Sequence, residues 1–199
     1  KAQVSHALCD ARLAAELDLA RPGCPALTTV ALFGSGTPDG LDARAAGKPA
    51  AFANVDTAAE DTALIAFTSG TTGKPKGTMH FHRDVLAACA CFPRSTLCAS
   101  PDDLFTGSPP LAFTFGLGGL LLFPLSIGAA TLLVERPAPE FLLPAIAKYR
   151  ATVLFTAPTS YRAMAAEVGN HDLSSLKKCV SAGEALPAAT RKLWKDATG

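Results

Sequence analysis

The later part of the chain alternates between short apolar segments and helix-like stretches, and this alternation constrains the fold more than any other feature. Strands are predicted at 130–134, 152–155 and 178–181, and helices at 139–149, 158–168 and 187–197. Pro139, Pro158 and Pro187 each stand at the expected first position of a helix, where the missing N–H of proline costs nothing. Strands separated by helices form right-handed crossovers. The sequence therefore predicts an α/β fold with a largely parallel sheet flanked by helices.

A loop rich in glycine, hydroxyl groups and lysine follows the apolar segment 64–66. From Phe67 to Gly77 it reads Phe-Thr-Ser-Gly-Thr-Thr-Gly-Lys-Pro-Lys-Gly. Glycines let backbone N–H groups converge on an anion, and the hydroxyls and lysines add donors and charge. Pro75 and the strand-like alternation after it distinguish this loop from an ordinary P-loop, which leads into a helix. The pattern predicts a polyphosphate-binding loop between two strands; the alternative is an exposed turn with two solvated lysines.

Three short segments follow predicted strands directly. They are Thr68, the pair 156–157 and the pair 182–183. Ligands of open parallel sheets bind at the carboxyl ends of the strands. The three segments are therefore predicted to contribute to one composite site.

The segment 68–77 resembles the phosphate-binding signature of the adenylate-forming (AMP-binding) superfamily, which includes acyl- and aryl-CoA synthetases, luciferases and adenylation domains of peptide synthetases. Three later segments follow in the family's order. The segment 110–116 resembles the aromatic wall of the acyl pocket, 157–161 the Pro-Thr turn into a helix, and 181–187 the Gly-Glu segment where nucleotide base and acyl group meet. The combination of 115–118 with 181–187 is most similar to benzoate and 2-aminobenzoate CoA ligases.

The resemblance implies part of the large N-terminal domain of an ATP-dependent ligase. Such an enzyme activates a carboxylic acid, here an aromatic one such as benzoate or 2-aminobenzoate, as acyl-AMP and transfers it to coenzyme A, with Mg²⁺ on the phosphates. An adenylation domain that loads a carrier protein and an inactive nucleotide-binding fragment remain alternatives. The nucleotide-binding residues that the resemblance implies are Thr68, Ser69, Gly70, Thr71, Thr72, Gly73, Lys74, Lys76, Gly183 and Glu184. The implied substrate-binding residues are Phe113, Phe115, Gly116 and Ala182.

Several family motifs have no counterpart in the 199 residues. They are the Thr-Glu pair near the metal, the aspartate that holds the ribose, and the hinge to a small domain with the catalytic lysine. The resemblance therefore implies that the Mg²⁺ ligands and the catalytic lysine lie outside this chain. We expect the missing C-terminal part of the same polypeptide as a partner, and an isolated chain without turnover. Residues 1–60 are expected to form a partial N-terminal α/β segment with a surface connection, and 61–199 the phosphate-loop and acyl-pocket subdomain.

The first sixty residues carry weaker signals. Apolar residues at helical spacing predict an amphipathic helix over 2–19, and 27–33 reads as a strand. The glycine-rich segment 34–40 imitates a dinucleotide fingerprint, but its spacing and Pro38 favour a turn. Residues 38–61 are expected to form a surface connection with little order.

The stretch from Leu104 to Val134 contains no charged residue, which raises the alternative of a membrane span. Three prolines and five glycines in it favour a buried helix ending near Pro124, followed by a strand.

The net charge of +1, from 18 basic and 17 acidic residues, gives no basic excess that would attract nucleic acid or an anionic membrane. Six cysteines without paired spacing, and His80 and His82 without a further ligand, predict neither disulfides nor a metal site. A reduced, cytoplasmic protein is the expectation.

Overall fold

The computed structural model describes residues 2–68 and 75–199, which divide into two compact units. The first unit comprises Lys1–Asp61 and Phe67–Thr78, and the second comprises Thr62–Ala66 and Met79–Gly199. The strands β3 (Thr62–Thr68) and β4 (Lys76–Phe81) pair in a two-stranded sheet. The two strands predicted on either side of the 68–77 segment are therefore confirmed.

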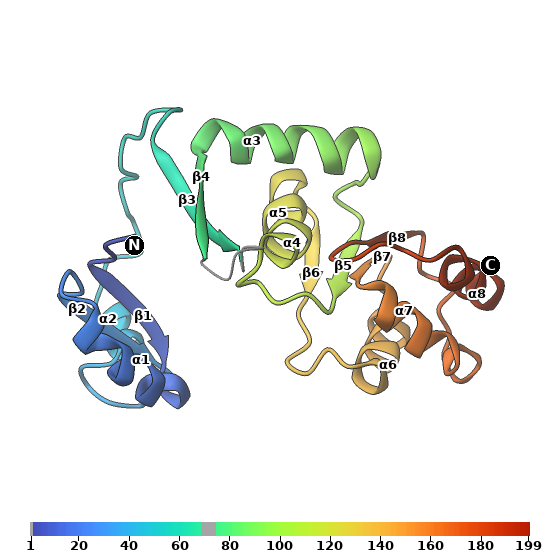
Figure 1. Ribbon diagram of the computed structural model, residues 1–199, viewed down its shortest axis with the longest axis horizontal. Helices are drawn as coiled ribbons and strands as arrows, with labels where there is room; N and C mark the ends of the chain where they lie inside the picture. The colour runs from blue at the N-terminus through green and yellow to red at the C-terminus, as the bar shows by residue number, and fades with distance from the viewer. Residues whose placement is uncertain (1, 69–74) are drawn as a thin grey trace. The chain divides into compact units, whose positions relative to one another are not determined.

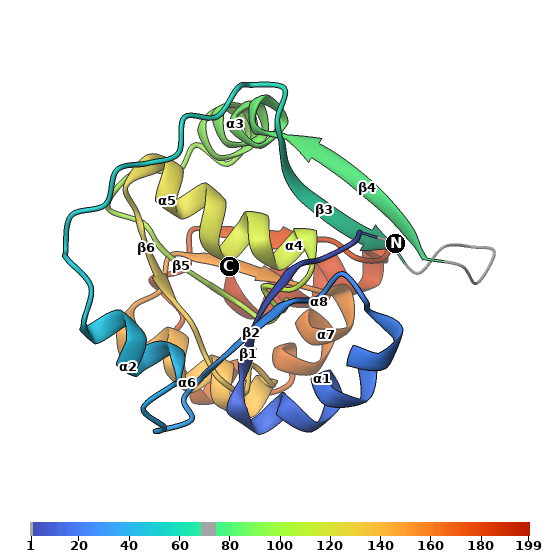
Figure 2. The same ribbon diagram turned by 90° about the vertical axis from the view of Figure 1, so that its left-hand side faces the viewer.

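The first unit begins with a parallel pair of strands, β1 (His6–Asp10) and β2 (Thr29–Phe33), which lie side by side in Figure 2. The helical connection between them consists of η1 (Ala11–Leu13), α1 (Ala14–Ala20) and η2 (Arg21–Gly23). The prediction of one helix over 2–19 is wrong in its first half. Pairing with β2 holds 6–10 extended, and Asp10 accepts the Arg12 N–H at 2.9 Å, so the helical path begins only after it.

A short helix, α2 (Leu41–Ala46), lies within the segment that was expected to have little order. Its first turn is anchored because the Asp42 carboxylate accepts the Gly34 N–H at 2.7 Å. This carboxylate ties the turn after β2 to the helix, a contact that local composition does not reveal. The expectation for 38–61 is therefore wrong at α2, whereas no helix or strand is present from 47 to 61.

The second unit is built on a four-stranded sheet of order β6-β5-β7-β8. All three neighbouring pairs are parallel, as the sequence predicted. The strands are β5 (Leu104–Gly107), β6 (Ala130–Leu132), β7 (Val153–Thr156) and β8 (Lys178–Ser181). The central strand β7 is buried along its whole length, as expected for a strand covered on both faces.

Helices cover both faces of this sheet (Figure 1). Along β7, Leu154 packs into one apolar cluster while Val153 and Phe155 pack into another, because neighbouring side chains point to opposite faces. The first cluster is formed with α6 (Pro139–Tyr149), α7 (Pro158–Ala165), η5 (Val168–Asn170) and α8 (Ala188–Thr198). The second is formed with η3 (Phe92–Thr96), α4 (Thr114–Leu117), η4 (Gly118–Leu122) and α5 (Phe123–Ile127). The helix α3 (His82–Cys91) precedes η3 and contacts α5.

The uncharged stretch forms the consecutive helical segments α4, η4 and α5 between β5 and β6. The sequence predicted a helix that ends near Pro124, but the helical path continues to Ile127. Pro124 lies in the first turn of α5, where proline is tolerated. Gly128, with φ of 75°, ends the helix in the left-handed conformation. A Cβ on Gly119 would lie 2.3 Å from the Phe155 ring, so a residue without a side chain allows this close approach. Within the described residues, no helix is both long and apolar enough to cross a bilayer.

A buried ion pair joins the amino ends of the strands. Asp103, which is 4% exposed, accepts from Lys178 Nζ at 2.6 Å, from Thr152 Oγ1 at 2.8 Å and from the Ser100 N–H at 2.9 Å. Burial alone would raise the pKa of Asp103, but the hydrogen bonds and the positive charge of Lys178 outweigh it and hold the pKa below its usual value. The cluster links the starts of β5, β7 and β8.

We expect Asp103→Asn to lower the free energy of unfolding at neutral pH by about 1 to 3 kcal/mol, because it leaves the largely enclosed Lys178 ammonium without its counter-charge. Since the folded pKa of Asp103 lies below the unfolded value of about 3.9, the carboxylate stabilises the fold above that pH. This stabilisation is lost as the pH falls through the folded pKa. Urea denaturation of both proteins over a pH series should show their difference shrinking below about pH 4.

Asp172→Asn is the matched control. Asp172 and Arg150 are also 2.6 Å apart, but both side chains are more than half exposed. Solvent screens such a pair, so the same substitution should cost much less there. Equal losses at the two positions, or a difference for Asp103 that does not change with pH, would contradict the prediction.

Candidate functional site

The carboxyl ends of β7 and β8 bring two of the predicted segments together. Thr156 and Ser181 are the last residues of these strands and are register partners. The segments 156–157 and 182–183 therefore leave the sheet at the same edge. This is the edge where open parallel sheets bind their ligands.

The turn from β7 into α7 presents a hydroxyl group at this edge. Ala157 is the extended N-cap residue of α7, and Pro158 occupies its first turn. Thr159 follows, and its Oγ1 donates to Oε1 of Glu184 at 3.2 Å. Glu184 lies beyond the end of β8, after Gly183, whose φ of 91° only glycine adopts without strain. The predicted nucleotide-binding residue Glu184 is thus held against the first turn of α7.

Tyr161 anchors that turn to the sheet. Its Oη lies 3.0 Å from the carbonyl oxygen of Val180 and 3.2 Å from that of Leu154, so the hydroxyl hydrogen is shared between β8 and β7. Its ring packs edge-on against Trp194 of α8 at 5.0 Å between centroids. Burial raises the pKa of Tyr161 far above its usual value, so the phenol remains neutral and serves as an anchor.

A pair of hydroxyl groups joins the ends of β5 and β7. Ser108 Oγ and Thr156 Oγ1 are 2.5 Å apart, and the Ser108 N–H donates to the Phe155 carbonyl at 3.1 Å. Thr156 is completely buried. The pair fixes the point where the chain leaves β5 toward the aromatic segment 110–116.

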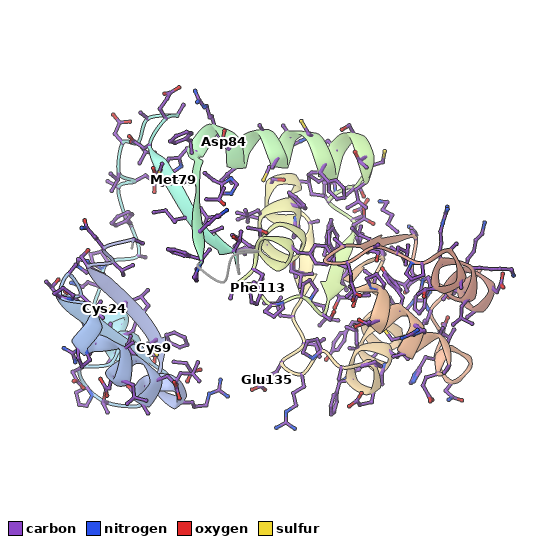
Figure 3. The ribbon with its side chains drawn as sticks, viewed as in Figure 1. Cys9, Cys24, Met79, Asp84, Phe113 and Glu135 are labelled. Carbon is purple, nitrogen blue, oxygen red and sulfur yellow. The ribbon has the colours of Figure 1, made fainter. Side chains whose placement is uncertain are left out.

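The predicted acyl-pocket residues lie in different surroundings. Phe113, labelled in Figure 3, is the N-cap residue of α4 and is 63% exposed. Phe115 is half-buried and contacts Phe155, with 5.7 Å between ring centroids. A Cβ on the buried Gly116 would lie 2.1 Å from the Pro110 carbonyl oxygen, so close packing requires glycine there. Ala182 is half-buried at the end of β8. Of these residues, Phe113 is the one whose ring is mostly free to meet a ligand.

The predicted phosphate loop is described only at its ends. Thr68 is the exposed last residue of β3, and Lys76 is the exposed first residue of β4. The predicted contacts Ser69, Gly70, Thr71, Thr72, Gly73 and Lys74 lie outside the described residues. Their roles stay predictions from the sequence.

A cavity of about 290 Å³ lies between β8 and α8. Tyr161, Cys179, Ser181 and Trp194 form part of its wall, together with the cationic residues Lys177, Arg191 and Lys195. Within the described part of the chain, Ser181 Oγ and Trp194 Nε1 are the buried side-chain polar atoms that lack a partner. The cavity borders the open edge of β8, beyond which the described sheet has no further strand.

A metal-ligating cluster is absent from residues 2–68 and 75–199, since no three His, Cys, Asp or Glu side chains converge there. A Mg²⁺ ion bound to nucleotide phosphates needs few protein ligands. The described residues therefore do not assign a protein ligand to such an ion.

A family model provides the decisive comparison. The model described as AMP-binding enzyme matches residues 1–199, the whole chain. The chain belongs to this family.

Similar proteins of the AMP-binding family include enzymes for several acids. Benzoate–CoA ligase of Thauera aromatica is 32% identical over 174 residues, which cover 86% of this chain and 33% of that enzyme. Acetyl-coenzyme A synthetase of Citrobacter koseri is 36% identical over 146 residues, covering 69% of this chain and 22% of the enzyme. The crystal structure of the anthranilate CoA ligase AuaEII with anthranoyl-AMP superimposes with a TM-score of 0.90 at 32% identity, over 99% of this chain and 39% of that one.

The AMP-binding chain thus spans a third or less of the length of these curated relatives, at 33% and 22%. Its α/β fold with a parallel sheet is that of the N-terminal domains of adenylate-forming enzymes, as the sequence predicted. Membership of the adenylate-forming acyl- and aryl-CoA ligase family is likewise confirmed.

Sequence reasoning missed two contacts of the site. It named Glu184 without finding its partner Thr159, 25 positions away. It included Tyr161 only as the end of the family-like segment 157–161, without its contacts to β7 and β8. A Pro-Thr pair at a helix start does signal a hydroxyl at the edge of a sheet, but its partner depends on the tertiary fold.

We expect Gly183→Ala to lower the free energy of unfolding by about 1 to 3 kcal/mol, because a side chain is strained at a φ of 91°. No atom lies within 4 Å of the position that the new Cβ would take, so the cost comes from the backbone and not from a clash. Urea denaturation measures the loss. Gly169→Ala, where the Cβ also meets nothing within 4 Å but φ is not positive, should be close to neutral. If Gly183→Ala leaves the free energy of unfolding unchanged, a side chain at position 183 does not strain this turn.

Proposed function

We propose that this chain is the nucleotide- and acid-binding part of an ATP-dependent acyl- or aryl-CoA ligase. The observation that carries the proposal is the close likeness of the backbone, over nearly the whole chain, to a ligase crystallised with an acyl adenylate. The family match over all residues and the polar groups gathered at the ends of β7 and β8 support it. The complete reaction is proposed for a longer protein that includes this chain.

The proposed reaction has two steps. A carboxylate oxygen of the acid attacks the α-phosphorus of ATP, the bond from that phosphorus to the bridging oxygen breaks, and pyrophosphate leaves. The thiolate of coenzyme A then attacks the acyl carbon, and AMP leaves with the electron pair of the acyl–oxygen bond. Both steps require positioning of the reactants and stabilisation of the negative charge on the leaving group.

The phosphate loop is proposed to act in the first step. Backbone N–H groups and hydroxyls of 68–73 would hold the β and γ oxygens, while Lys74 and Lys76 would neutralise charge on the departing pyrophosphate. Mg²⁺ would lower the charge of the phosphates further, but we assign it no protein ligand in this chain and derive no step from it.

We propose an aromatic acid as the substrate. The exposed ring of Phe113, at the start of α4, offers a face for stacking. The chain is similar to both a benzoate–CoA ligase and an acetyl-coenzyme A synthetase, so sequence identity alone does not indicate which acid is bound. Benzoate and 2-aminobenzoate are therefore the first acids to test, with acetate as the comparison.

We expect Lys76→Ala, in the full-length ligase that contains this chain, to slow carboxylate-dependent exchange of pyrophosphate into ATP by about 10- to 100-fold. The substitution removes one charge-assisted hydrogen bond to the leaving group, and such a bond contributes about 1.5 to 3 kcal/mol. Lys192→Ala is the control, because Lys192 is an exposed lysine of α8 paired with Asp196. An unchanged exchange rate for Lys76→Ala would count against the role of the loop.

We expect the 199-residue chain alone to form no acyl-AMP, because it spans only a third or less of its curated relatives and part of the site is proposed to lie in the remainder. Incubation with ATP, Mg²⁺ and benzoate, followed by mass spectrometry for benzoyl-AMP, tests this. The full-length ligase serves as the positive control. Detection of benzoyl-AMP with the short chain would show that these residues suffice for adenylation.

A further inference from the structure

We propose that Thr159 is a positioning residue that orients the Glu184 carboxylate for contact with the nucleoside part of ATP. The inference rests on the proposed function and adds to it a residue outside the signature segments that carry the nucleotide contacts. Its basis is the hydrogen bond of 3.2 Å between Thr159 Oγ1 and Glu184 Oε1. Within the described residues, Thr159 is the only side chain that holds this carboxylate.

The backbone around both residues is fixed independently of their contact. Thr159 lies in the first turn of α7, which begins at Pro158, and Tyr161 attaches that turn to the carbonyls of β7 and β8. Glu184 follows Gly183, whose positive φ turns the chain sharply after β8. The hydrogen bond therefore links two segments that the sheet already brings to one edge.

Both side chains are exposed, so the contact contributes little to a core. An exposed glutamate populates many rotamers and loses that freedom when it binds a ligand. The Thr159 hydroxyl restricts the Glu184 side chain before ATP binds, because the χ1 angle of the β-branched threonine is itself stiff. Holding a side chain in its bound conformation raises affinity by reducing the ordering cost of binding.

The charge of Glu184 selects the part of ATP that it can contact. A carboxylate accepts hydrogen bonds and is repelled by phosphate oxygens. Its partner is therefore a donor on the nucleoside, an amine of the base or a hydroxyl of the ribose. One oxygen, Oε1, already accepts from Thr159, and Oε2 has no partner within the described residues. This leaves Oε2 as the acceptor for the nucleoside.

The test uses Thr159→Val in the full-length ligase, since valine keeps the shape of threonine and removes its hydroxyl. We expect the ATP dissociation constant from titration calorimetry, and the KM for ATP in pyrophosphate exchange, to rise about fivefold to tenfold, as for loss of one hydrogen bond. We expect kcat to change less than about twofold, because the reacting phosphorus is not contacted. Thr159→Ser keeps the hydroxyl and should restore most of the affinity.

A double-mutant cycle separates positioning from a general effect on the fold. In a Glu184→Gln background, Thr159→Val should weaken ATP binding by much less than it does in the wild type, because the carboxylate it orients is gone. Thr28→Val is the matched control: it removes another exposed threonine hydroxyl, bonded to the Ser5 carbonyl, and should leave ATP affinity unchanged. Melting temperatures of all variants show whether the fold is retained.

The outcomes are distinct. Unchanged ATP affinity for Thr159→Val, equal effects with and without Glu184, or failure of Thr159→Ser to restore binding would each overturn the positioning role in an otherwise active ligase. If Thr159→Val unfolds, the ATP affinities of Thr159→Ser and Glu184→Gln are compared instead. Wild-type ATP affinity in both of these variants would overturn the proposal. A wild-type ligase without carboxylate-dependent exchange would instead overturn the proposed function, and this inference with it.

Discussion

The side chains of β7 alternate between two apolar clusters, and this alternation determines how the second unit is layered. Leu154 faces α6, α7 and α8, whereas Val153 and Phe155 face η3, α4, η4 and α5. A slip of one residue in the pairing of β7 would exchange the two faces. The buried Asp103 cluster opposes such a slip, because it fixes the starts of β5, β7 and β8 through charged hydrogen bonds. The strand ends, and the polar groups on them, are positioned as a consequence.

Much of the second unit could be predicted from the sequence because its signals are local. Prolines mark the starts of α6 and α7, and apolar runs mark β6 to β8, so the order of these strands and helices was correct. Pro187 was one position off, since it caps α8 and does not begin it. The first unit was predicted less well: the apolar spacing of 2–19 fits a helix, yet pairing with β2 makes 6–10 a strand.

The contacts that give the candidate site its geometry could not be predicted in this way. Asp103 and Lys178 are 75 positions apart, and Thr159 and Glu184 are 25 apart. Each pair meets only because parallel strands bring segments that are distant in sequence to one edge of the sheet. The resemblance to a family supplied the names of residues such as Glu184, but it did not supply their partners. Local pattern gives the residue types of a site, whereas their pairing follows from strand order and register.

The charges of the proposed nucleotide contacts follow the chemistry of ATP from one end to the other. Lysines 74 and 76 suit the polyanionic phosphates, and the carboxylate of Glu184 suits the neutral nucleoside with its N–H and O–H donors. Phosphate oxygens placed against the Glu184 carboxylate would be repelled by its charge. Under the proposed function, this repulsion would disfavour a nucleotide bound in the reverse direction at this residue. Under the proposed function, orientation matters because the acid must reach the α-phosphorus opposite the leaving pyrophosphate.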